Sequence, residues 1–282
     1  TIDETTNIEN EPVLSCLKLI RSQLCNQAPL IHCITHPIVI NDCANAVLAI
    51  GGRPIMAEHP AEVTDIASSA AALTVSLGNI TDARAESMFL AGKAIKRINN
   101  TENGKRASVI DLVGITCSSF RMELAKHFIK ECEPAVIKGN GSEIRAIAGT
   151  AFHGTGVDVS AADAVSAKNP DSVKSMAHIA GKLAQETGAV VMVTGEVDII
   201  ASPENEIAYA IYNGSPNMAK VTGTGCMLTC ITGTYLAVAD ALTACVLAVV
   251  TLDCAGECAN AANGLGTYHI ELIDQLSLMD EA

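Results

Sequence analysis

Short apolar segments alternate with longer helical patterns along most of this chain, and this alternation restricts its fold more than any other feature. Six apolar runs have the length and composition of buried strands, namely Leu30–Ile34, Arg53–Ala57, Leu73–Leu77, Ser108–Val113, Ala135–Lys138 and Ala189–Val193. Between them lie segments with helical spacing, namely Asn41–Ile50, Pro60–Ala70, Ala83–Ile98, Ser118–Lys130 and Ala161–Thr187. Strands that alternate with helices of this length form βαβ units. The sequence therefore predicts an α/β fold with a mostly parallel central sheet and helices on both faces.

The 282 residues are predicted to form a single domain, 1–282, because no internal repeat, low-complexity tract or Pro/Ser-rich linker divides them. Hydrophobic residues make up 49% of the chain, which is enough for a large core. The most apolar run, Ala241–Leu252, has 12 residues. A helix that crosses a bilayer needs about 20. We therefore expect this run to be a buried helix, and we expect no membrane partner.

Charge and composition restrict the partners and the compartment. With 18 Lys and Arg against 31 Asp and Glu, the formal net charge is −13, which disfavours nucleic acid because affinity for its backbone comes from clustered cations. The chain also has no Trp and only 3% aromatic residues, so it lacks stacking platforms. Residues 1–11 are polar and acidic, unlike a signal peptide. The 11 scattered cysteines are typical of reduced thiols. We expect a cytoplasmic protein.

Four predicted strands end in the same way, with polar residues and a glycine after the apolar run. These ends are Ser76–Asn79, Asp111–Gly114, Lys138–Asn140 and Thr194–Glu196. In an open α/β sheet, ligands bind beyond the carboxyl ends of the strands. Each glycine on its own is equally consistent with an ordinary left-handed turn. Four such ends together favour a ligand site at this edge.

The segment Val221–Cys226 reads Val-Thr-Gly-Thr-Gly-Cys and leads into a helical pattern from Met227. A glycine turn that opens a helix presents unpaired N–H groups and the positive end of the helix dipole, which together bind anions such as phosphate. The chain has neither GxxxxGK[ST] nor GxGxxG, so this is not one of the common nucleotide loops. A plain helix-capping turn stays open as the alternative.

Cys226 lies at the start of that predicted helix, where the dipole favours the thiolate and lowers the pKa of the thiol. Its candidate roles are a base, a nucleophile, or a small packing residue. A nucleophilic cysteine normally has a histidine that orients it, and no histidine lies near Cys226 in the sequence.

Asp111 ends one predicted strand and Glu143 comes at the start of the helix after the next one, so two carboxylates are expected at neighbouring strand ends. Such a pair can hold Mg²⁺, directly or through water, and let it bridge nucleotide phosphates. The alternative for Glu143 is a helix-capping role together with Ser142. The pairs Cys226/Cys230 and Cys254/Cys258 are spaced to hold zinc. Their Ala-rich surroundings favour packing instead.

Taken together, these motifs resemble the hydroxyethylthiazole kinase family, which has a ribokinase-like fold. The matching stretches run nearly from end to end, and they are His32–Thr35, Asn41, Ala44–Asn45, Gly51–Ala57, Asp111, Val113–Gly114, Gly139–Asn140, Ser142–Ile144, Val193–Asp198, Lys220–Cys226 and Gly264–Leu272. The combination of Thr-Gly-Glu-Val-Asp with Lys-Val-Thr-Gly-Thr-Gly-Cys is highly specific. Other ribokinase-like enzymes usually have Asp where this chain has Cys226.

The resemblance implies ATP- and Mg²⁺-dependent phosphorylation of the hydroxyl of 4-methyl-5-(2-hydroxyethyl)thiazole, a step of thiamine biosynthesis or salvage. It also implies a homotrimer with active sites between subunits. The implied roles are Cys226 as catalytic base, Met56 and Gly223 at the substrate, Lys138 and Thr194 at ATP, and Asp111 and Glu143 at the metal.

The sequence departs from the family pattern at three places. Lys138 stands where the family usually has Arg, Leu112 where it has Pro, and His36-Pro37 where it favours Asn after the threonine. These departures leave two alternatives open, namely a related ribokinase-like kinase for a pyrimidine or pyridoxine alcohol, and a catalytically inert ligand-binding homologue. A cysteine-nucleophile hydrolase is the least supported hypothesis.

Overall fold

The computed structural model describes residues 17–101, 106–153, 160, 163–204, 207–262 and 264–279. They form one eight-stranded sheet in the order β2-β1-β3-β4-β5-β6-β7-β8. The strands are β1 (Leu30–Ile34), β2 (Arg53–Ile55), β3 (Ala72–Ser76), β4 (Ala107–Asp111), β5 (Val136–Asn140), β6 (Val190–Thr194), β7 (Asp198–Ala201) and β8 (Ala208–Ile211). Strands β1 to β6 are parallel, and β7 and β8 are antiparallel to their neighbours.

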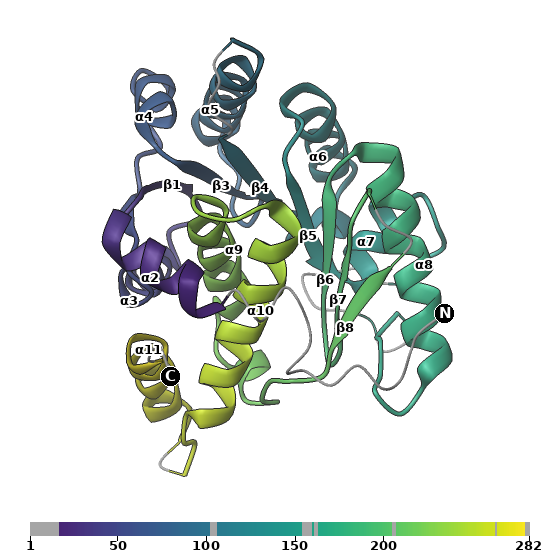
Figure 1. Cartoon of the computed structure of the whole chain (residues 1–282). Coiled ribbons are helices and arrows are strands. Elements are labelled where there is room, and N and C mark those ends of the chain that lie inside the picture. Colours follow the sequence, from purple (N-terminus) through teal and green to yellow (C-terminus); the bar gives the residue numbers. More distant parts are fainter. Residues whose placement is uncertain are drawn as a thin grey trace.

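Helices cover both faces of this sheet (Figure 1). They are α2 (Leu17–Gln27), α3 (Ile40–Ala49), α4 (Val63–Ser69), α5 (Asp82–Thr101), α6 (Ser119–Cys132), α7 (Gly141–Ile147), α8 (Pro170–Thr187), α9 (Thr224–Leu236), α10 (Ala241–Cys258) and α11 (Leu265–Leu278), with short 3₁₀ helices η2 (Ile115–Cys117) and η3 (Met218–Lys220). The α/β fold with a mostly parallel sheet is confirmed.

Alternation of side chains along the strands divides the interior into two cores. In β4, for example, Val109 belongs to the core beneath α9 and α10, whereas the next residue, Ile110, belongs to the core beneath α5 and α6. The same division separates Val136 from Ile137 in β5. Because successive strand residues point to opposite faces, continuous apolar runs are buried on both sides, as in parallel sheets in general.

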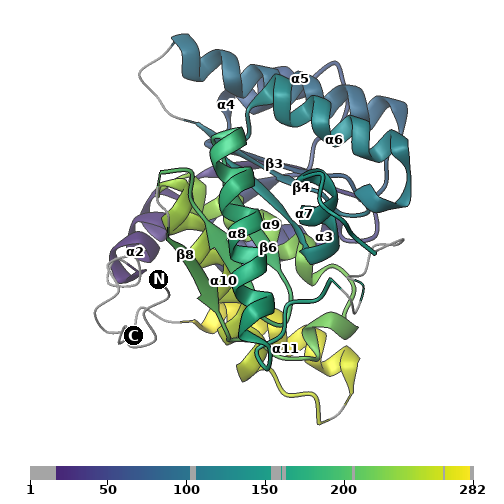
Figure 2. The same ribbon diagram turned by 90° about the vertical axis from the view of Figure 1, so that its right-hand side faces the viewer.

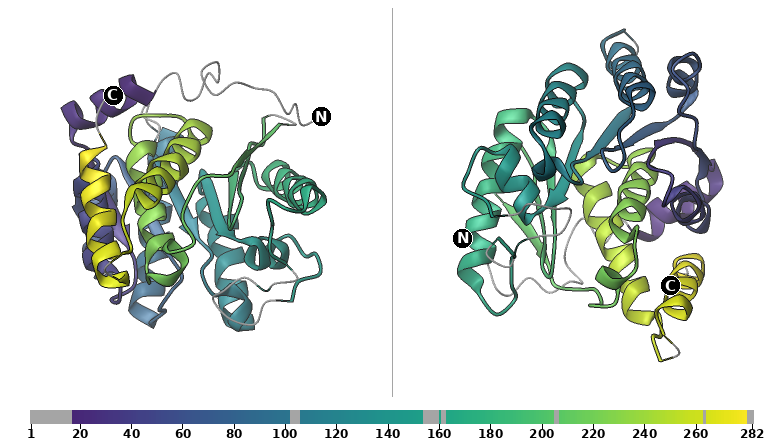
Figure 3. Two further views of the ribbon diagram at one scale, coloured as in Figure 1. Left: turned by 90° about the horizontal axis from the view of Figure 1, so that it is seen from below. Right: turned by 180° about the vertical axis from the view of Figure 1, so that it is seen from behind.

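Helices α2, α3, α9, α10 and α11 lie on one face, where α11 runs beside α3 (Figure 3). On the opposite face α5 and α6 lie side by side, as Figure 2 shows, and the rings of Phe89 and Phe128 meet edge to face with centroids 5.7 Å apart. Both layers leave the carboxyl edge of the parallel strands to the loops.

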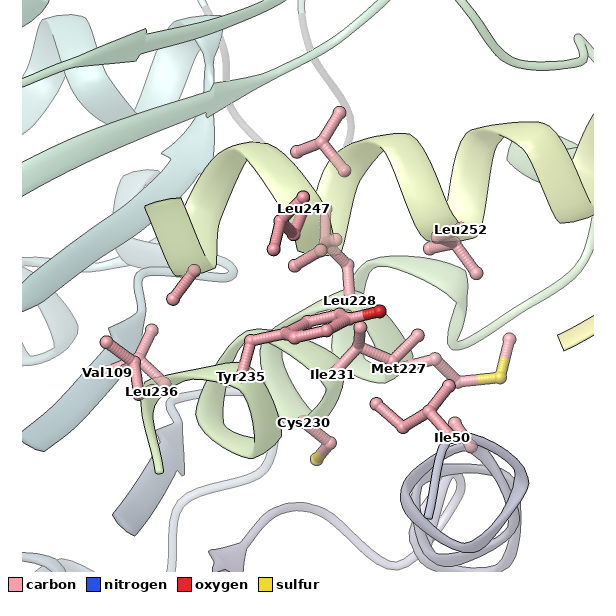
Figure 4. Packing of buried hydrophobic residues seen from close by; sticks show 14 of the residues in the cluster. Ile50, Val109, Met227, Leu228, Cys230, Ile231, Tyr235, Leu236, Leu247 and Leu252 are labelled. Carbon is pink, nitrogen blue, oxygen red and sulfur yellow. The ribbon is translucent and has the colours of Figure 1, made fainter. Parts of the chain in front are cut away.

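Helices α9 and α10 pack against one another in the centre of the first core, around Tyr235 and Leu247 (Figure 4). By length and composition alone α10 is apolar enough to cross a membrane, with a mean hydropathy of 1.7 over 18 residues. Of that window 61% is buried, and α10 packs against α9, α11 and the strands β6 to β8. These contacts support the prediction of a buried core helix.

The six predicted strands are present, with ends that differ by at most two residues. One predicted helix is wrong at its start, and two strands were missed. The helix expected over 161–187 begins only at Pro170. Asn169 caps it there by accepting a hydrogen bond from the N–H of Ser172, and proline is well suited to the first helical position. Residues 161 and 162 lie outside the described residues. The antiparallel strands β7 and β8 were not predicted at all.

Candidate functional site

Polar side chains converge where β4 and β5 end and where α7 and α9 begin. In the sheet register Asp111, the last residue of β4, lies opposite Lys138 of β5. Lys138 Nζ contacts Asp111 Oδ2 at 2.9 Å, and only 4% and 2% of the two side chains are exposed. The hydroxyl of Thr229, on α9, donates to the same oxygen over 2.7 Å. This ion pair is the buried part of the site.

The pair is a fixed source of charge. Burial on its own would lower the pKa of Lys138, but the charge of Asp111, with smaller contributions from Cys226 and Glu143, outweighs it and raises that pKa. The lysine therefore stays an ammonium ion. Removing one member of such a buried pair leaves an uncompensated charge, which typically costs about 3–5 kcal/mol.

The amino-terminus of α9 lies directly beside this ammonium group. Gly223 caps the helix with φ +93°, in the left-handed region. A Cβ on Gly225 would lie 3.4 Å from Lys138 Nζ, so the glycine keeps the approach to the ammonium open. Thr222 and Gly225 are exposed to solvent. The exposed start of the helix thus lies directly over the buried ammonium group, and helix N–H groups next to a positive charge have the geometry of an anion site.

Cys226 is in the first turn of α9, but its thiol is not acidic. Only 6% of the residue is exposed, and burial, followed by the charge of Asp111, raises the pKa of Cys226 to about 12. The expectation that the helix dipole would lower this pKa is therefore wrong. A thiol in this state holds its proton at neutral pH, so it needs a partner before it can accept another one.

Glu143 closes the site from the α7 side. Its Oε1 accepts from the N–H of Gly114 and its Oε2 from the N–H of Asn140, both over 2.8 Å. Asn140 in turn accepts from the N–H of Glu143, which completes a capping box. The expected capping partner, Ser142, donates to Asp163 instead. Burial, and next the charge of Asp111, raise the pKa of Glu143 to about 7, so two carboxylates repel each other across the site.

The carboxylates fit only one kind of metal site. Among the described residues, no group of three or more His, Cys, Asp or Glu side chains is placed to hold a metal ion. Asp111 and Glu143 both already accept hydrogen bonds from the protein. They therefore suit a hydrated Mg²⁺ that takes its remaining ligands from water and substrate phosphates, rather than an ion caged by the protein.

Two of the predicted site residues lie on the flanks. Met56 follows the edge strand β2, and Thr194 ends β6 opposite Asn140. With neighbouring strands about 4.8 Å apart, the five steps from β2 to β6 place these residues roughly 24 Å apart along the edge. The structure brings together Asp111, Lys138, Glu143 and Cys226, with Gly223 in the turn that begins the same helix as Cys226, and it leaves Met56 and Thr194 at either end of that row.

The sequence reasoning missed Thr229, and it named Ser76 and His36 without predicting that both lie against Cys226. Thr229 is three residues beyond Cys226 on α9, a spacing that places both on one helix face and would have revealed it. Ser76 Oγ lies 3.9 Å from Cys226 Sγ. His36 Nε2 lies 3.4 Å from the same sulfur, although 190 positions separate the two residues in the chain. No local pattern signals that contact.

Relatives with known names match nearly the whole chain. The model of the hydroxyethylthiazole kinase family matches residues 21–281. A Clostridium botulinum protein named hydroxyethylthiazole kinase 2 is 44% identical over 263 residues, which cover 93% of this chain and 95% of that protein. The hydroxyethylthiazole kinase of Desulfovibrio desulfuricans is 40% identical over 266 residues, covering 89% and 90%.

Solved structures agree with the sequence matches. The hydroxyethylthiazole kinase protein from Pyrococcus horikoshii OT3 superposes with a TM-score of 0.80 at 28% identity, over 94% of this chain and 93% of that one. A ribokinase-like superfamily protein from Enterococcus faecalis reaches 0.61 at 13% identity, over 94% and 95%, which shows a shared fold only. The fold is thus ribokinase-like, and the chain belongs to the hydroxyethylthiazole kinase family.

Proposed function

We propose that this chain transfers the γ-phosphoryl group of ATP to the hydroxyl of 4-methyl-5-(2-hydroxyethyl)thiazole, at the row of residues between β4 and α9. Family membership makes the chain a kinase, an ATP-dependent phosphotransferase. The observation that carries the assignment of the site is the contact between Lys138 and Asp111 beside the amino-terminus of α9. A fixed ammonium group and free helix N–H groups are what a phosphoryl group in transfer requires.

Each residue has a distinct task in this proposal. The N–H groups at the start of α9 hold the transferring group, and Lys138 neutralises part of its charge. Asp111 holds Lys138 in place, and Cys226 lies next to the hydroxyl that is phosphorylated. Asp111 and Glu143 would hold a hydrated Mg²⁺ ion. When bound, this ion supplies positive charge to the nucleotide phosphates.

In this proposal the two substrates bind at opposite ends of the row of site residues. We place the nucleotide towards Thr194, at the end of β6, and the thiazole towards Met56 and Gly223, as the family pattern implies. The contact of Gly223 with the loop before α3, where a Cβ would lie 2.6 Å from Val39, supports this division. The homotrimer and the cytoplasmic location stay predictions.

A coupled assay of ADP release tests the proposal, with the thiazole alcohol, ATP and Mg²⁺. We expect turnover of the thiazole alcohol and little with pyrimidine or pyridoxine alcohols. Asp111→Asn is expected to lower kcat by about 10²-fold or more, because Lys138 loses its anchor. The matched control is Asp171→Asn, at an exposed position in the first turn of α8.

The alternatives predict different results. Preferred turnover of a pyrimidine or pyridoxine alcohol would contradict the substrate. Tight binding of the thiazole without turnover would indicate the inert homologue. If Cys226→Ala keeps full activity while Asp111→Asn loses it, the electrostatic part of the proposal stands and the role of the sulfur falls.

A further inference from the structure

The side chain of His36 is the one titratable group that the described residues place against the sulfur of Cys226 within hydrogen-bonding reach, with Nε2 and Sγ 3.4 Å apart. His36 lies in the loop after β1, and Cys226 comes from α9. In the strand order β2-β1-β3-β4, the chain leaves β1 towards β2 on one side and leaves β3 towards β4 on the other. The loops after β1 and β3 therefore diverge between these two strands, where the strand order reverses. Crevices at such reversal points are where α/β sheets bind ligands.

The structure provides a fitted space for this ring. A Cβ on Gly78, in the loop after β3, would lie 2.2 Å from His36 Cδ2 and 2.8 Å from Nε2. Only glycine at 78 lets the imidazole lie here. Arg121 anchors this loop by donating to the carbonyls of Leu77 and Gly78, and Arg84 donates to the carbonyl of Asn79. Two arginines therefore fix the loop that borders the space for the ring.

The environment of the ring favours neutral imidazole, mainly through burial. Burial lowers the pKa of His36, and Arg84 and Arg121 lower it further, whereas Asp111 acts in the opposite direction. Glu58 balances part of the charge of Arg84 through a 2.8 Å ion pair. Neutral imidazole has one nitrogen with a free lone pair. The thiol of Cys226, with its raised pKa, still carries a hydrogen.

We propose that His36 is a positioning residue of the reaction, which acts through Cys226 by accepting the thiol hydrogen on Nε2 while the sulfur takes the proton of the substrate alcohol. This rests on the proposed function. The alcohol O–H bond breaks and a new S–H bond forms. The original S–H bond breaks as Nε2–H forms, and the alcohol oxygen forms its bond to phosphorus as ADP leaves. The imidazolium ion then returns its proton from Nε2 to solvent; the residue is partly exposed, and its Nδ1 is buried.

The test compares His36→Gln with the wild type at several pH values. For the wild type we expect kcat to fall on the acidic side, because protonated imidazole accepts no hydrogen. For His36→Gln we expect kcat to be about 10–100-fold lower, KM for ATP to change less than twofold, and the acidic decline to disappear. The matched control, His127→Gln at an exposed position on α6, should behave as the wild type does.

Three further measurements distinguish a proton-relay role of His36 from a purely structural role. Added imidazole should restore part of the activity of His36→Ala, which a purely structural role does not predict. Combining His36→Gln with Cys226→Ala should cost no more than Cys226→Ala alone. Gly78→Ala should lower kcat as His36→Gln does, and its melting temperature shows whether it folds.

The outcomes distinguish the two proposals. If the wild type fails to phosphorylate the thiazole alcohol, both proposals are overturned. If the wild type is active and His36→Gln keeps its kcat, or keeps the same acidic decline, only the role of His36 is overturned. Additive losses in the double variant would also overturn it.

Discussion

At the scale of single residues, Gly223 combines two demands on one position. Its φ of +93° lies where a residue with a side chain is strained, and a Cβ would come within 2.6 Å of Val39 Cγ1. Gly264, before α11, has φ +105° with nothing within 4 Å of its Cβ position. Both positions disfavour a side chain because φ is positive, although their ψ angles differ (−6° at Gly223 and 174° at Gly264), and only Gly223 also has a close contact.

We predict that Gly264→Ala lowers the free energy of unfolding by about 1–3 kcal/mol, the cost of a sparsely populated backbone conformation for a residue with a side chain. Gly223→Ala should lower it further and also lower kcat/KM, because the clash displaces the start of α9 from Lys138. Denaturant unfolding and the ADP-release assay measure both. Equal stability of the two variants, with activity unchanged, would contradict this account.

Much of the site was accessible from the sequence because the strand-end rule locates polar residues without knowing the strand order. Asp111 and Lys138 were predicted in this way, Cys226 was predicted from the glycine turn that opens a helix, and the structure brings the three together. The rule explains less about the glycines at the strand ends. Gly114 has a positive φ, whereas Gly78 is required by the ring of His36. Such contacts depend on loops that only the folded sheet brings together.

At the scale of elements, the packing of α10 against α9 stabilises the helix that carries Cys226. Leu247 of α10 is fully buried in this core, whereas Leu278, at the end of α11, is 68% exposed. Leu247→Ala should lower the free energy of unfolding by about 2–5 kcal/mol, because it leaves a cavity that the packed neighbours fill only in part.

For the control Leu278→Ala we expect a change within about 0.5 kcal/mol. Chemical denaturation of both variants at one pH gives the comparison. A loss for Leu278→Ala as large as that for Leu247→Ala would mean that α11 is covered in solution by a surface absent from the isolated chain.

The elements that the sequence predicted are those with a strong period of their own. Strands β1 and β3 to β6 and helices such as α5 bury apolar patterns, so local sequence determines them, whereas the edge strand β2 has only three residues and is partly exposed. Strands β7 and β8 have four residues each, and Ala208–Ile211 is only half-buried. Their structure comes from pairing with β6, which is a tertiary effect.

At the scale of the whole molecule, the side chains of two carboxylic residues from different elements, β7 and α10, lie next to each other. Asp198 begins β7, and its Oδ1 accepts from the N–H of Gly195 over 2.9 Å. It also shares a hydrogen bond with Asp253 of α10. Burial, and for Asp253 next the charge of Asp198, raise the pKa of both groups. Folding therefore holds a proton that the unfolded chain releases.

A raised carboxyl pKa means that the folded state binds more protons than the unfolded state above about pH 4. Stability from this pair is complete below that pH and is lost as pH rises. We predict that Asp253→Asn is more stable than the wild type at pH 8, and that the difference shrinks at pH 5. Urea unfolding at both pH values measures it, with Asp171→Asn as the control. A difference that grows at pH 5 would contradict the shared proton.

Helix α9 is buried on almost every side, from Cys226 to Leu236. An element packed in this way does not shift without disrupting the core of the molecule. In the proposed reaction, we therefore expect the surrounding loops, rather than α9, to move as substrates enter and products leave. Changes of specificity during evolution are then expected in those loops, whereas the helix itself accepts few substitutions.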